Sequence, residues 1–67
     1  MNLGDPVIVI DPGSPRCGTW GTFVAATRTG LLAVRFPDGV EELGTFQVES
    51  DARLAATALA RLGVQAA

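Results

Sequence analysis

Short apolar runs separated by glycine and proline make up the first 49 residues, whereas most of the remaining chain has an apolar repeat without such breaks. Runs of β-branched and aromatic residues bounded by turn-forming residues are typical of β-strands. They predict four strands, at residues 6–10, 20–26, 31–36 and 40–46, the last with a bend at Gly44. The strongest turn signal is Pro37-Asp38-Gly39, because proline presets φ and glycine accepts a positive φ. The pattern predicts a mainly β domain over residues 1–49.

Alternation within the strands predicts which side chains face the core. In the third strand one face carries only large apolar residues, namely Leu32, Val34 and Phe36. The second strand is ambiguous, because either Phe23 and Ala25 or Trp20 and Val24 can face inward. We favour Phe23 and Ala25 inside, which leaves Trp20 at least partly exposed.

Residues 50–63 carry an apolar stripe at helical spacing, with residues at both ends that favour helix termini. Ser50 or Asp51 suits the N-cap, and Gly63 suits the left-handed residue that ends a helix. The apolar face consists of Leu54, Ala55, Ala58, Leu59 and Leu62. This face packs either on the sheet or on a second copy of the chain. In the second case the oligomer interface is formed by Leu54, Ala58, Leu59 and Leu62. Residues 64–67 are expected to form a frayed tail.

The only tryptophan, Trp20, lies between Gly18 and Gly21, where a small curled sheet would need glycine to bend or to allow close packing. Gly-Asp precedes the first strand at residues 4–5, and Val-Arg-Phe-Pro-Asp-Gly occupies residues 34–39. With the Gly-x-x-Gly step these segments resemble the SH3-like barrels of the KOW type over roughly residues 4–49. The resemblance implies a small barrel of four to five antiparallel strands, with the C-terminal α-helix outside the family pattern. Such barrels serve in nucleic-acid-bound modules, in protein-binding subunits and in one small enzyme class, so the fold does not select a function.

The charge and residue content narrow the function classes. The net charge is −2, all five positive charges are arginines, and there is no histidine. An acidic chain without lysine is poorly suited to gripping phosphates, and the commonest general base is missing. The single Cys17 cannot form an internal disulfide or a cysteine-based zinc site. We therefore expect no catalytic residues, no cofactor and no metal, in a cytoplasmic protein without a signal peptide or a membrane span.

These features favour a non-catalytic interaction module, either an adaptor or a subunit of a larger protein assembly, with a homo-oligomer as one form of it. Trp20 is interpreted either as a corner aromatic packed on the sheet or as an exposed recognition residue beside arginines. The predicted partner-binding residues are Arg16, Trp20, Arg28 and Arg35. The alternative is a KOW-like nucleic-acid module that uses the same four residues, which the net charge disfavours.

A remote alternative comes from plasmid-type dihydrofolate reductases, which are SH3-like barrels that assemble as tetramers around a central pore. The pore of that family carries Val-Gln-Ile-Tyr and a lysine. Here the segment Phe46-Gln47-Val48-Glu49 retains only the glutamine and the aliphatic residue after it, and the chain has neither tyrosine nor lysine. We therefore expect the protein not to be an enzyme.

Overall fold

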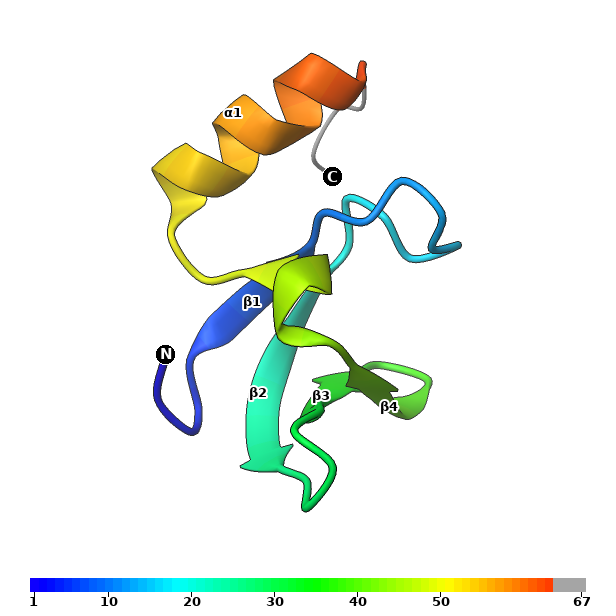
Figure 1. The fold of residues 1–67 in the computed structure, drawn as a ribbon, viewed down its shortest axis with the longest axis vertical. Coiled ribbons are helices and arrows are strands. Elements are labelled where there is room, and N and C mark those ends of the chain that lie inside the picture. The colour runs from blue at the N-terminus through cyan, green and yellow to red at the C-terminus, as the bar shows by residue number, and fades with distance from the viewer. Residues whose placement is uncertain (64–67) are drawn as a thin grey trace.

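A computed structural model describes residues 1–63, which form five strands, a short 3₁₀ helix and a C-terminal α-helix (Figure 1). In chain order these are β1 (Pro6–Val9), β2 (Trp20–Ala26), β3 (Leu32–Phe36), β4 (Gly39–Leu43), η1 (Thr45–Gln47), β5 (Val48–Glu49) and α1 (Ala52–Leu62). The mainly β class, with a helix after the strands, is confirmed. The predicted tail at 64–67 lies outside the described residues. No helix within residues 1–63 has the length and apolarity needed to cross a membrane.

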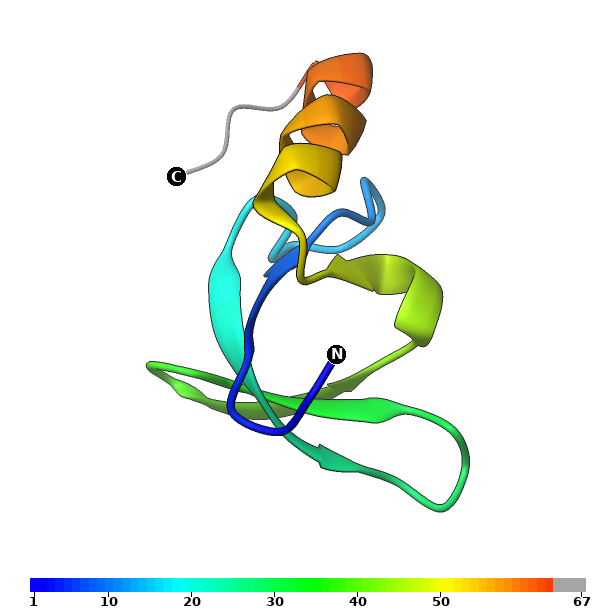
Figure 2. The same cartoon turned by 90° about the vertical axis from the view of Figure 1, so that its left-hand side faces the viewer.

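The strands form one antiparallel sheet in the order β4-β3-β2-β1-β5. The β3–β4 hairpin crosses the direction of β1 and β2, so the sheet is strongly curled (Figure 2). Helix α1 lies at one end of the molecule, and the β2–β3 hairpin tip lies at the other (Figure 1). Pro6 pairs with Thr22 of β2, whereas the pairing of β1 with β5 begins only at Ile8. Proline thus stands where β1 has a neighbour on one side only, as a residue without an N–H requires.

Residues 7–9 of β1 are buried on both faces of the sheet and separate two apolar clusters. Val7 and Val9 face the main core inside the curl of the sheet. The rest of this core consists of Phe23, Leu32, Val34, Phe36, Leu43 and Val48. On the other face, Ile8 packs against Ala55 and Leu59 of α1. The helix therefore docks on the outer face of the sheet, and the predicted inward face of β3 is confirmed.

Two predictions about the strands are wrong. Ala25 is exposed, because a register shift between Phe23 and Ala25 places an extra residue, Val24, in β2. Such a bulge reverses the side-chain alternation beyond it, so only Phe23 is buried as predicted. The fourth strand ends at Leu43 and not at residue 46, because Gly44 and the residues after it turn into η1. A short fifth strand, β5, follows; the pattern of apolar runs predicted four strands, and the resemblance implied four to five.

The ends of α1 agree with the sequence. The Asp51 carboxylate accepts hydrogen bonds from the backbone N–H groups of Arg53 at 2.8 Å and Leu54 at 3.3 Å. Gly63 ends the helix at a φ of 73°, in the left-handed region. Asp51, and not Ser50, is therefore the N-cap, and both helix ends are determined locally.

Candidate partner-binding groove

An open groove of about 430 Å³ lies on the outer face of β1, β2 and β3. It is lined by Pro6, Trp20, Gly21, Thr22, Arg35, Phe36 and Pro37. We call it the Trp20 groove. Trp20 is 37% exposed, so its ring is available at the surface, as expected from the sequence.

Strand register explains why these side chains meet. Thr22 of β2 lies between Pro6 of β1 and Arg35 of β3, which places the three in one row across the sheet. Directly paired residues point to the same face, and residues two apart in a strand also share a face. Trp20 therefore projects from the same face as Arg35, beside it on the diagonal. Two of the four predicted partner-binding residues thus line one groove.

The polar groups of the groove are mainly hydrogen-bond donors. Among the described residues, the side chains of Trp20, Thr22 and Arg35 make no hydrogen bond, and Arg35 makes no ion pair. Indole and guanidinium groups can only donate, whereas the threonine hydroxyl donates and accepts. No carboxylate is among the lining residues. The groove therefore favours an acceptor-rich group.

The floor of the groove depends on Gly21. A Cβ atom at this position would lie 2.6 Å from Cγ1 of Val34, 2.8 Å from the carbonyl oxygen of Arg35 and 2.9 Å from Cε1 of Phe36. β2 and β3 approach this closely only because Gly21 has no side chain. The two glycines beside Trp20 have different roles, since Gly18 has a φ of 86° and donates to the carbonyl of Val9 at 2.8 Å.

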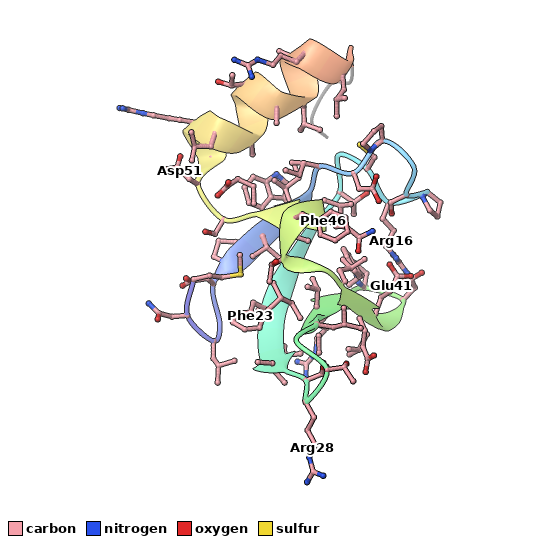
Figure 3. The ribbon with its side chains drawn as sticks, viewed as in Figure 1. Arg16, Phe23, Arg28, Glu41, Phe46 and Asp51 are labelled. Atoms are coloured by element: carbon pink, nitrogen blue, oxygen red, sulfur yellow. The ribbon has the colours of Figure 1, made fainter. Side chains whose placement is uncertain are left out.

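The other side of the Phe36 ring is covered by Arg16, whose Cζ lies 4.2 Å from the ring centroid. The Arg16 guanidinium forms two 3.0 Å contacts with the Asp38 carboxylate and a third, of 3.5 Å, with Glu41 (Figure 3). It thereby ties the loop before β2 to the β3–β4 hairpin. The hydrogen bond from Arg16 lowers the pKa of Asp38, and the same contact raises the pKa of Arg16. The charge of Arg16 is thus paired within its own chain, although the sequence predicted Arg16 as a partner-binding residue.

Acid should weaken the fold through this contact. The pKa of Asp38 is lower in the folded chain than in the unfolded one, so its contribution is complete above the ordinary aspartate pKa of about 3.9 and is lost as the pH falls through the folded value. Asp11 acts in the same direction, because hydrogen bonds from Gln47 and then Gly13 lower its pKa. We expect the melting temperature to decline below about pH 4, and to decline less steeply in Asp38→Asn. Thermal unfolding between pH 2.5 and pH 7 measures this, and parallel curves for the two proteins would contradict the assignment.

Arg28 is not part of the groove. It lies in the turn after β2 and points away from the tip of the β2–β3 hairpin (Figure 3). Trp20 begins β2 and Ala26 ends it, a strand length of about 20 Å. The cluster of four predicted from the sequence is therefore divided into the Trp20–Arg35 pair, the internally paired Arg16 and the distant Arg28.

The predicted oligomer interface is also divided. Leu59 is buried within its own chain, and Ala58 is half-buried. Leu54 and Leu62 are 58% and 42% exposed. Only this outer part of the apolar face of α1 is free to contact a second copy.

Cys17 and Gln47 both contact other parts of their own chain. Cys17 is half-buried beside the cluster of Ile8 and α1. The Gln47 side chain accepts from the Gly44 N–H and donates to the Asp11 carboxylate, both at 2.7 Å. This tie between residues 36 apart was not predicted from the sequence. Within residues 1–63 there is no group of three or more metal-ligating side chains.

Comparison with protein-family models, with curated proteins and with solved structures finds no match to this chain. The chemistry of the groove is therefore the basis for assigning a function.

Proposed function

We propose that the protein is a non-catalytic interaction module, built on a small SH3-like barrel of the KOW type, that binds a protein partner in the Trp20 groove. The observation that carries the proposal is an exposed tryptophan beside an arginine without a partner among the described residues. Tryptophan and arginine contribute disproportionately to binding energy at protein interfaces. The curled sheet of five short antiparallel strands supports the barrel assignment.

Protein is favoured over nucleic acid because the arginines are dispersed. A nucleic-acid surface needs several cations along one path. Here the guanidinium of Arg16 is already paired with Asp38 and Glu41, and Arg28 lies at the far end of β2. A single groove arginine without an ion-pair partner among residues 1–63, on a chain of net charge −2, fits a short-range protein contact better.

The test is capture of partners by the immobilised protein from the cytosolic extract of its source, with and without nuclease. Trp20→Ala should lose a protein that the wild type retains after nuclease treatment, and that protein should bind again when purified. Phe46→Ala is the matched control, because it removes an aromatic ring that is 80% exposed and lies outside the groove. Capture that is unaffected by Trp20→Ala, or that disappears with nuclease, would contradict the proposal.

Self-association through α1 is a second, compatible proposal. It is supported by the exposure of Leu54 and Leu62 on a helix whose buried residues already hold it to the sheet. A stability that rises with protein concentration would be its signature.

A further inference from the structure

Resting on the proposed function, we infer that the Trp20 groove binds a short acidic peptide segment in which a carboxylate lies next to a large apolar side chain. The carboxylate binds Arg35, and the apolar side chain packs on Trp20. The partner is therefore an acidic peptide, and Arg35 and Trp20 are the two residues that recognise it.

The first support is the balance of donors and acceptors. The side chains of Arg35, Thr22 and Trp20 all carry hydrogen-bond donors that no described residue accepts from. The prolines at positions 6 and 37 have no N–H and add apolar surface at the same groove. A ligand group that only accepts hydrogen bonds, and that is charged, matches such a lining, and a carboxylate forms a paired contact with a guanidinium.

The second support is the contrast between the two arginines of this region. Arg16 is neutralised by two carboxylates of its own chain, at 3.0 and 3.5 Å. Arg35 lies on the outer face, where its direct neighbours across the sheet are Thr22 and Val40. Neither neighbour carries a charge, and Val40 is 57% exposed, which extends the apolar surface beyond Arg35. No described residue forms an ion pair with Arg35, not even Glu42, which lies diagonal to it on the same face, so the charge of Arg35 is available to a ligand.

The third support is the number of charges that the groove can accommodate in a ligand. A chain of net charge −2 repels a long polyanion, whereas a single carboxylate within a mostly apolar segment experiences mainly the local field of Arg35. The lining has one cation, and its remaining large side chains are aromatic or proline. A segment with one or two acidic residues among apolar ones matches that composition.

The experiment selects random decapeptides displayed on phage against the purified wild-type protein and three variants. Wild type should enrich peptides with Asp or Glu adjacent to a large apolar residue. Arg35→Gln should lose the acidic preference, and Trp20→Ala should lose the enrichment as a whole. Arg28→Gln removes the same charge outside the groove and should select the same peptides as wild type.

A selected sequence without aromatic residues is then synthesised with its acidic residue and with glutamine in its place. Trp20 is the only tryptophan and the chain has no tyrosine, so its fluorescence reports occupancy of the groove directly. We expect the glutamine peptide to bind wild type about tenfold more weakly, and Arg35→Gln to bind both forms equally. Raising the salt from about 50 mM to 500 mM should weaken only the acidic form on wild type.

The outcomes separate this inference from the proposed function. Peptides enriched for apolar residues without acidic ones would overturn the acidic specificity and leave the interaction module in place. Enrichment that is equal on wild type and Trp20→Ala would overturn the groove as the binding site. A single-stranded oligonucleotide that quenches Trp20 more strongly than the peptides would overturn the peptide assignment in favour of nucleic acid.

Discussion

Gly21→Ala should destabilise the protein by about 2–3 kcal/mol, more than other single-methyl changes at glycine positions without positive φ. The added Cβ would lie 2.8 Å from a backbone atom, the Arg35 carbonyl oxygen, and within 3 Å of the buried side chains of Val34 and Phe36. A backbone atom cannot rotate away, so β2 and β3 would have to separate. For a domain of this size the melting temperature should fall by roughly 10–20 °C.

The matched control is Gly13→Ala. A Cβ at Gly13 would meet only Asp11 Oδ1, at 3.4 Å, an ordinary contact distance. Gly13 is exposed, and its φ is outside the positive region. We expect a change within about 0.5 kcal/mol. Thermal unfolding of the two variants measures the difference. Equal melting temperatures would show that the close approach of β2 to β3 at Gly21 does not contribute to stability.

Leu59→Ala should cost about 2–4 kcal/mol, because it leaves a cavity between α1 and the outer face of β1. Leu59 is 1% exposed and packs with Ala55 on Ile8. A core this small supplies only about 3–5 kcal/mol in total, so the variant should be partly unfolded near room temperature. Urea unfolding followed by circular dichroism measures the loss.

Leu54→Ala makes the same chemical change five residues earlier on the same helix, where the side chain is 58% exposed. It should alter the free energy of unfolding by no more than about 0.5 kcal/mol at low protein concentration. If α1 also joins two copies, the loss in Leu54→Ala should grow with protein concentration. Equal effects of the two substitutions under all conditions would contradict the docking of α1 through Leu59.

The parts of the fold that local chemistry determines were predictable from the sequence. The alternation of Leu32, Val34 and Phe36 identified a buried face, and Asp51 and Gly63 identified the helix ends. These features need only neighbouring residues, because strand alternation and helix capping are short-range.

The structural features that the sequence did not predict depend on contacts between residues far apart in the chain. The bulge that turns Ala25 outward adjusts β2 to its pairing with β3. Arg16 meets Asp38 across 22 residues, and no pattern along the chain reports that contact. For the same reason the sequence could name four candidate binding residues, but only strand register could show that Trp20 and Arg35 share a groove.

The position of β1 in the sheet has a consequence for how the chain is made. The first strand is the most enclosed, yet its neighbours β5 and α1 are the last elements of the described chain. Ile8 cannot complete its contacts until Glu49 and Leu59, which are more than 40 residues downstream, have been synthesised. During synthesis Ile8, on the outer face of β1, therefore lacks its partners until nearly the whole described chain has been made, whereas Val7 can pack on residues of β2 and β3 earlier. Without α1, residues 1–49 would leave Ile8 uncovered on the outer face of β1, so the helix completes the burial of the strand that begins the sheet.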